Sequence, residues 1–443
     1  MTGSRPVPRA GAHLHPLSMD YDGDMDEFRF LHAADLHLDS PLLGLTQKSG
    51  EYARLIADAS RRAFSDMVDL AIQTECRFVV LAGDVFDGDL RDTQCGLFFI
   101  NGMARLQQAG IRVFMILGNH DAENRFARHL HITDNVHLFA SSRAETCIME
   151  DLGVAVHGRS FGRRDVTDNI ARKYPVPVPG LFNIGILHTA CQGREGHETY
   201  APCTVEQLVN HGYQYWALGH VHNREILHEN PYVVYAGNLQ GRHAREAGPK
   251  GASLVTVRGE RVLSVDHQVL DAVRWASEMV DLTDATTPAD MTDRIRDAGR
   301  SLVAQAQGRP IALRLELVGA TALHAHLIRG THDAQLEIET ILASLSDEIW
   351  LERLKIHTRP PPRPAVLDPS TGGRIAADIQ QAATPDVLRA ELSDILTAIM
   401  DRMPAHARTE EMRETILNDV PGRAIDLALS LVDNPEGHDN ANQ

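Results

Sequence analysis

The stretch "QYWALGHVHN", from Gln214 to Asn223, places two histidines one residue apart at the end of an apolar run. Side chains two residues apart in an extended segment point to the same side, so His220 and His222 are predicted to face one point just past a strand. Gly219 is expected to let the backbone turn there. Taken alone, the pair is better interpreted as surface histidines, because the chain has 23 of them. A functional interpretation requires other residues to converge on the same point.

Four other predicted strands end in similar residues. These strands are "FRFLHAAD", "FVVLAGD", "RVFMILGNHD" and "FNIGILHTA", and helices are predicted near residues 52–75 and 93–109. In an open α/β sheet, ligands gather beyond the carboxyl ends of the strands. The residues at these ends are, in chain order, Asp35, His37, Asp84, Asn119, His120, Asp121 and His188. Carboxylate, amide and imidazole groups suit manganese, iron or zinc, and their number predicts a two-metal centre that activates water for attack on phosphorus.

The motifs "DLH", "GDVFD", "GNHD", a lone histidine and "GHVH" resemble, in this order, the motif set of the calcineurin-like metallophosphoesterases. The sequence around these motifs is similar to that of the DNA-repair exonuclease branch, which includes SbcD-like and YhaO-type proteins. The similar segments include "LHAADLHLDSPL", "YAPC" and "YAGN" followed by "GPKGASLV". The resemblance implies an α/β fold, a two-sheet metallophosphoesterase sandwich. A small α+β capping module and a helical C-terminal region are expected to follow it.

The resemblance also implies a role for each motif residue. One divalent ion would be held by Asp35, His37 and His222, and the other by Asn119, His188 and His220, with Asp84 bridging the two. His120 would face the scissile phosphate as general acid or charge stabiliser, and Asp121 would orient it by a hydrogen bond. The expected ions are manganese, with iron or zinc as alternatives.

Other polar residues near the motifs have simpler interpretations. His32 is predicted to be a core histidine and Cys203 a buried small residue. Asp39, Asp87 and Asp89 are expected to cap turns or to be solvated. A substrate contact and a solvated loop both remain open for His197, Arg242, His243 and Arg245.

The 443 residues are too many for one core, so several domains are expected. Met19 or Met25 is an alternative first residue of the protein. The predicted segments are a disordered lead (1–27), the metallophosphoesterase domain (28–270), the capping module (271–357), a proline-rich linker (358–373), a helical partner-binding region (374–433) and a disordered tail (434–443).

The composition restricts the choice of function. A formal charge of −17 repels polyanions, so contact with DNA must rest on local basic groups, metal ions or a partner. One local basic group consists of Arg159, Arg163, Arg164, Arg172 and Lys173. No apolar run is long enough for a bilayer, and the N-terminus lacks the apolar core of a secretory signal. Five cysteines without a CxxC pair predict the reducing cytoplasm and no structural zinc site.

Two function classes remain. The first is a metal-dependent DNA exonuclease or endonuclease subunit acting in DNA repair, and the alternative is a phosphatase or phosphodiesterase acting on a small molecule or protein. A non-catalytic scaffold is disfavoured because every ligand position is filled. The residues beyond about 270 favour the nuclease, because a small-molecule enzyme needs little more than the first domain.

The resemblance further implies partners: DNA, a separate coiled-coil SMC-like ATPase and, as an open alternative, a second copy of the chain. No G-x-x-x-x-G-K-[ST] loop occurs in the sequence, so ATP hydrolysis by that route needs another chain. A helix is predicted over Pro385 to Met403, and its apolar stripe suits such a contact. The stripe includes Leu392, Ile395, Leu396 and Ile399. Packing of the same stripe on the chain's own helix near "EEMRETILNDV" is the alternative.

Overall fold

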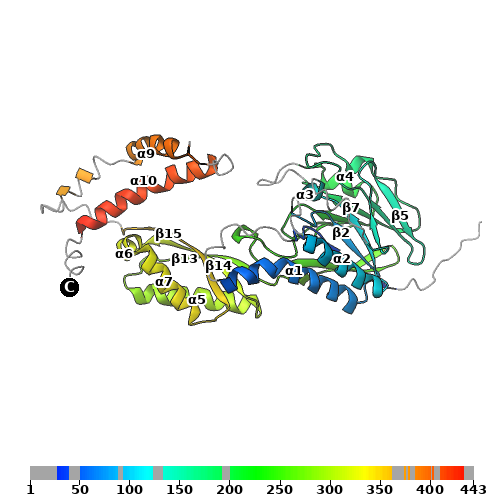
Figure 1. Ribbon diagram of the computed structural model, residues 1–443, viewed down its shortest axis with the longest axis horizontal. Coiled ribbons are helices and arrows are strands. Elements are labelled where there is room, and N and C mark those ends of the chain that lie inside the picture. The colour runs from blue at the N-terminus through cyan, green and yellow to red at the C-terminus, as the bar shows by residue number, and fades with distance from the viewer. Residues whose placement is uncertain are drawn as a thin grey trace, which may run out of the picture.

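The computed structural model describes residues 27–38, 50–87, 93–122, 133–191, 200–361, 374–375, 378–379, 385–400, 402–403 and 410–433. Within these residues, a domain of two six-stranded sheets comes first, a three-stranded sheet with helices follows, and the helices α9 and α10 lie in the C-terminal part (Figure 1). Nearly all of the predicted lead, most of the predicted linker and the predicted tail lie outside the described residues.

The first sheet has the strand order β12-β11-β1-β2-β3-β4. Strands β1 to β4 run parallel, β11 pairs antiparallel with β1, and β12 pairs antiparallel with β11. Parallel neighbours need crossover connections, which the helices α1 and α2 supply between β1, β2 and β3. The bounds are β1 (Phe28–Ala33), α1 (Gly50–Gln73), β2 (Phe78–Ala82), α2 (Thr93–Gln108), β3 (Arg112–Ile116), β4 (Val136–Leu138), β11 (Gly251–Arg258) and β12 (Arg261–Val269).

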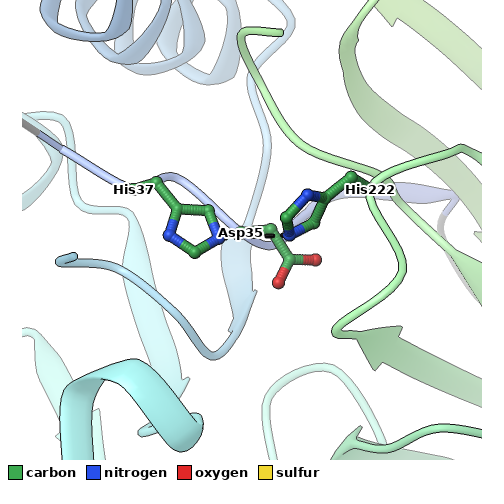
Figure 2. Close-up of side chains that lie close together, drawn as sticks. All are labelled: Asp35, His37 and His222. Carbon is green, nitrogen blue, oxygen red and sulfur yellow. Dashed lines mark hydrogen bonds between the residues drawn. The ribbon is translucent and has the colours of Figure 1, made fainter. Parts of the chain in front are cut away.

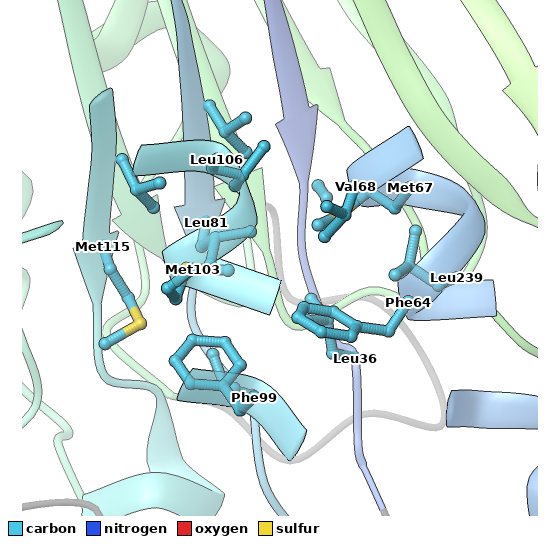
Figure 3. Packing of buried hydrophobic residues seen from close by; sticks show 14 of the residues in the cluster. Leu36, Phe64, Met67, Val68, Leu81, Phe99, Met103, Leu106, Met115 and Leu239 are labelled. Atoms are coloured by element: carbon cyan, nitrogen blue, oxygen red, sulfur yellow. The ribbon is translucent and has the colours of Figure 1, made fainter. Parts of the chain in front are cut away.

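One face of this sheet is covered by α1 and α2 (Figure 3). Phe64 and Val68 of α1 lie one helical turn apart and are buried, as are Phe99 and Met103 of α2. They pack against strand residues such as Leu81. The helical spacing of apolar residues in the sequence therefore identifies the faces of α1 and α2 that pack on the sheet.

The second sheet has the order β5-β6-β7-β8-β10-β9, with antiparallel strands only at its two edges. Its inner face packs on the other face of the first sheet, where Phe30 stacks on Phe78 at 4.9 Å and meets Tyr215 edge-on at 5.3 Å. The strands are β5 (Glu145–Met149), β6 (Val154–Gly158), β7 (Phe182–His188), β8 (Tyr215–Gly219), β9 (Glu225–Glu229) and β10 (Tyr232–Tyr235). This is the predicted two-sheet α/β sandwich, and it brings the carboxyl ends of β1, β2 and β3 close to those of β7 and β8.

The third sheet, β13-β14-β15, lies beside the N-terminal end of α1 (Figure 1). Its strands are all parallel and are joined by helices, an α/β arrangement rather than the α+β module that the sequence suggested. The difference arises because the first strand was not recognised in the sequence. The elements are β13 (Arg274–Asp281), α5 (Pro288–Ala306), β14 (Ile311–Ala320), α6 (His324–Arg329), α7 (Thr331–Ala343) and β15 (Ile349–Arg359). Trp275 of β13 packs with Leu55 and Ala59 of α1, which joins this module to the first domain.

The C-terminal helices α9 (Pro385–Met400) and α10 (Glu410–Asp433) contact each other, and α10 also contacts α6. Leu396 and Leu417 are buried in this region, whereas Ile395 and Ile399 are 57% and 51% exposed. The predicted apolar stripe is therefore divided between internal packing and solvent. Among the described helices, none is both long and apolar enough to cross a bilayer.

Candidate metal centre

Side chains from both sheets meet where the parallel strands end. Figure 2 shows Asp35 and His37, which follow β1, beside His222, which follows β8. The Nε2 atoms of His37 and His222 lie 3.2 Å apart. Three groups of residues could each hold a metal ion, because the ligand atoms within a group all lie within 4.8 Å of one another. The groups are Asp35 with His37 and His222, His37 with Asp84 and His120, and Asp35 with Asp84 and His188.

Asp84 lies between these groups. Its Oδ2 is 3.3 Å from His188 Nε2 and 3.9 Å from His37 Nε2, and its Oδ1 accepts a hydrogen bond from the His120 backbone N–H at 2.9 Å. The residue is buried. A Cβ added at Gly118 would lie 2.2 Å from Asp84 Oδ1, so glycine is needed at this position of "GNHD" for the carboxylate to fit.

His188 and Asn119 form the side of the centre that comes from β7 and β3. His188 Nδ1 donates to the Ala82 carbonyl at 2.9 Å, so Nε2 is the ring nitrogen that faces the centre. That nitrogen lies 2.9 Å from Asn119 Oδ1. Both side chains are buried, so their orientation is fixed before any ligand binds.

His220 is placed differently from the expectation. Its φ is 98°, so the pair with His222 is not extended, and its backbone N–H donates to both carboxylate oxygens of Asp35 at 3.0 Å. Its ring lies edge-on to His188 at 5.3 Å and to Tyr200 at 5.5 Å. Among the described residues, the three ligand groups do not include it.

The explanation offered for Gly219 was also wrong. Its φ is not among the positive values, and the left-handed residue is the following His220. Glycine is required at 219 because an added Cβ would lie 2.2 Å from the Ala82 carbonyl oxygen and 3.0 Å from His188 Nδ1. The two sheets approach closely here, which lets ligands from both reach one point.

Three other predicted ligands share the left-handed conformation. The φ angles are 50° at Asp35, 42° at His37 and 52° at Asp84. Such residues cost on the order of 1–3 kcal/mol each and persist where surrounding contacts hold them. Here the backbone N–H groups of Asp35 and His37 donate to the carbonyls of Gly83 and Asp84 at 3.0 and 3.1 Å. In the described part of the chain, four of the eight non-glycine residues with positive φ lie at this candidate metal centre.

The orienting contact of His120 differs from the predicted one. The Asp121 carboxylate accepts from the backbone N–H groups of Val85, Phe86 and Gly118 at 3.1, 2.9 and 3.0 Å, so it shapes the loops around the centre. The carboxylate at His120 Nδ1 belongs to Asp87, 2.7 Å away. Asp87 was interpreted from the sequence as solvated or capping, and its side chain is only 17% exposed.

The charges in the centre fit divalent cations. Burial, with repulsion from Asp84, raises the pKa of Asp35 to about 6, and burial lowers the pKa of His37 to about 4. Burial opposes a charge on His188, but the carboxylates of Asp84 and Asp35 raise its pKa to about 9. Two buried carboxylates a few ångströms apart repel each other unless positive charge lies between them. Oxygen and imidazole donors of this kind suit manganese, iron or zinc.

Two further groups border the centre and were not assigned in the sequence. Glu246 Oε1 lies 2.6 Å from His222 Nδ1. Arg242, which the sequence left open, contacts that oxygen at 3.1 Å and lies 3.6 Å from Asp87 Oδ2. Burial opposes ionisation of Glu246, but its hydrogen bond with His222 and the nearby charges hold its pKa well below the usual range. The sequence signal that could have indicated both residues is the group of charged side chains in "GRHAREAGPKG", residues 241–251.

Two further predictions for single residues are confirmed. His32 is buried and bonds to the Tyr215 hydroxyl at 3.0 Å, and Cys203 is buried too, as predicted. Asp39, Asp89 and His197 lie outside the described residues.

A sandwich of two sheets that gathers buried carboxylates and histidines at its strand ends defines a metal-dependent phosphoester hydrolase. Residues 28–224 match the calcineurin-like phosphoesterase family, and residues 275–359 match the middle domain of metallophosphoesterase YhaO. The chain is 34% identical to the metallophosphoesterase YhaO of Bacillus subtilis over 390 residues, which cover 87% of this chain and 92% of that protein. The chain belongs to the calcineurin-like metallophosphoesterase family.

More distant relatives carry the name DNA double-strand break repair protein Mre11. The chain is 23% identical to the Mre11 of Methanopyrus kandleri, over 57% of this chain and 58% of that protein. It is 26% identical to the Mre11 of Methanosarcina mazei, over 53% of this chain and 37% of that protein. These similarities cover about half of this chain.

Proposed function

We propose that this metallophosphoesterase is a nuclease subunit that hydrolyses phosphodiester bonds of DNA in DNA repair. Similarity to the Mre11 repair proteins supports the substrate class. A three-stranded module and a helical pair that follow the catalytic domain support it further, since an enzyme for small phosphoesters does not need them. The alternative is a phosphatase or phosphodiesterase acting on a small molecule or protein.

The position of Asp84 is the observation that carries the proposed metal assignment. Its carboxylate lies within 3.9 Å of both His37 and His188, as a bridging ligand must. We assign one ion to Asp35, His37 and His222 and the other to Asn119, His188 and His220. The expected ions are manganese, with iron or zinc as alternatives. Two such ions would polarise the phosphate oxygens as Lewis acids and lower the pKa of water.

His120 is assigned the proton chemistry. Burial lowers its pKa, but the hydrogen bond to Asp87 and the charges of Asp84 and Asp87 outweigh burial and raise it. Asp87 holds Nδ1, so Nε2 remains to stabilise charge on the phosphate or to donate a proton to the leaving oxygen. His120 is 30% exposed at its side chain, which is compatible with contact to a substrate.

The test compares substrates and variants. Purified full-length protein with manganese is assayed on linear single- and double-stranded DNA and on bis-p-nitrophenyl phosphate. His120→Ala should slow hydrolysis by about 10²–10⁴-fold at unchanged metal content, because a general acid contributes that much. His332→Ala, an exposed histidine on α7, is the matched control. Hydrolysis of the small phosphodiester without any cleavage of DNA would favour the alternative.

We further propose that the helices α9 and α10 bind a coiled-coil SMC-like ATPase. Ile395 and Ile399 form an exposed apolar pair one turn apart, while Leu396 faces inward. An amphipathic surface of this kind suits contact with another helix. Ile395→Asp combined with Ile399→Asp should prevent co-purification with the co-expressed ATPase at unchanged phosphodiesterase activity. Val176→Asp, at an apolar position that is 80% exposed, is the control, and retained co-purification of the double variant would place the contact elsewhere.

A further inference from the structure

The His222 ring contacts the carboxylate of Glu246, a residue that is not among the proposed metal ligands. Glu246 belongs to a short 3-10 helix, Ala244–Glu246, and is buried. Its Oε1 lies 2.6 Å from His222 Nδ1, and its Oε2 accepts from the Asn238 side chain and the Arg242 backbone N–H, both at 2.8 Å. Both oxygens are engaged by the same loop, so the direction of the carboxylate is fixed.

The backbone of His222 is held from the same loop. Lys250 is buried, and its Nζ donates to the His222 carbonyl at 2.8 Å and to Asn223 Oδ1 at 2.9 Å. The Asn238 backbone N–H donates to the same carbonyl at 3.3 Å. Residues 238–250 therefore fix the main chain and the ring of His222 together.

This loop is in turn fastened to the three-stranded module. The Trp275 indole N–H donates to the Gly241 carbonyl at 2.8 Å, and the Gly248 N–H donates to the Trp275 carbonyl at 2.9 Å. Gln240 Oε1 accepts from the backbone N–H groups of Ala272 and Val273 at 2.8 and 3.1 Å. Glu246 thus approaches His222 from a rigid support, not from a free loop.

We propose that Glu246 is a positioning residue that sets the affinity of the ion bound by Asp35, His37 and His222, an inference that rests on the proposed metal assignment. With Nδ1–H donating to Glu246, the Nε2 of His222 keeps its lone pair for a metal and faces His37 Nε2 at 3.2 Å. Carboxylate partners of this kind orient a ligating imidazole and increase its basicity. In the described contacts Glu246 bonds to His222 and not to His188 or Asp84, so its influence is confined to one ion.

The experiment is a titration of manganese into metal-depleted full-length protein, followed by elemental analysis. Glu246→Gln should weaken one of the two ions by about 10–100-fold, the usual effect of losing such a partner, and leave the other unchanged. Glu229→Gln, at an exposed glutamate on β9, is the matched control and should bind both ions as the wild type does. Glu246→Asp keeps the charge, so its affinity for the weakened ion should lie between those of the glutamine variant and the wild type. It also serves as a second variant if the glutamine variant does not fold.

A merely structural role predicts different results. Loss of affinity for both ions, or a clear fall in the urea midpoint of the metal-free glutamine variant, would overturn the inference, as would unchanged binding of both ions. In a His222→Asn background, Glu246→Gln should cause no further loss of affinity for the ion assigned to Asp35 and His37, because Glu246 and His222 act through one contact. A wild-type protein that binds fewer than two ions would instead refute the metal assignment itself.

Discussion

Replacing Asp35 by asparagine should stabilise the metal-free protein while weakening the binding of the ion assigned to Asp35, His37 and His222. Asp35 is buried, and its carboxylate accepts the His220 N–H at both oxygens. Asparagine has nearly the same size, and its Oδ1 can accept the same hydrogen bond without carrying a charge. The substitution therefore isolates the cost of the buried charge from the packing of the side chain.

The magnitude follows from the shifted pKa. Burial and the neighbouring Asp84 raise the pKa of Asp35 from 3.8 to about 6 in the folded chain. At about 1.4 kcal/mol for each pKa unit, ionisation of Asp35 lowers the free energy of unfolding by about 3 kcal/mol above pH 6. Because the folded pKa is the higher one, this loss is absent below pH 3.8 and complete only above pH 6.

Urea unfolding of the metal-depleted proteins at pH 4 and pH 8 measures the effect. The Asp35→Asn variant should match the wild type at pH 4 and exceed it at pH 8 by about 3 kcal/mol. Manganese should then stabilise the variant at pH 8 less than the wild type, because the variant keeps the full ligand set of only one of the two ions. A variant that is no more stable than the wild type at pH 8 would refute the reasoning, because burial would then not oppose the charge.

Three further predictions test separate contacts. Asp87→Asn weakens the hydrogen bond and removes one of the two charges that raise the pKa of His120, so the protonated histidine, and with it activity, should be lost at a lower pH. An unchanged alkaline limb of the pH–rate profile would contradict this. Gly219→Ala places a Cβ 2.2 Å from the Ala82 oxygen, so it should destabilise the fold by about 1–3 kcal/mol in urea unfolding and reduce the metal content. The control is Gly422→Ala, where an added Cβ would meet no atom within 4 Å, and it should change neither stability nor metal content. Leu396→Ala should loosen the packing of α9 on α10 by about 2 kcal/mol or more, detected as faster proteolysis of that region at unchanged phosphodiesterase activity.

The layers of the fold were predictable because they depend on local periodicity. The apolar residues of α1 and α2 recur with helical spacing, and the buried strands β2 and β8 are continuous apolar runs. Strand β13 escaped recognition because its sequence "RWASEMVD" alternates too weakly to stand out from a loop. Its pairing with β14 comes from the tertiary structure, which a single sequence does not reveal.

The ligands could be identified as a set, but their geometry could not. Strand ends that carry Asp, Asn and His are visible in the sequence, and the sandwich brings them together. The sequence could not show which of Asp121 and Asp87 contacts His120, because both lie in the motifs. The difference arises because backbone N–H groups occupy the Asp121 carboxylate and leave Asp87 to bind His120. Glu246 was missed for a related reason, since it reaches His222 from a loop 24 residues away.

Strain and charge at the centre have one physical explanation. Asp35, His37, Asp84 and His220 all take positive φ angles, and two of them are buried carboxylates that repel each other. Each feature opposes folding by itself, and the surrounding hydrogen bonds and close-packed sheets hold them in place. Cations between the carboxylates would reduce this repulsion. The centre is therefore built at the cost of stability in the metal-free chain, and binding of two divalent ions would recover part of that cost.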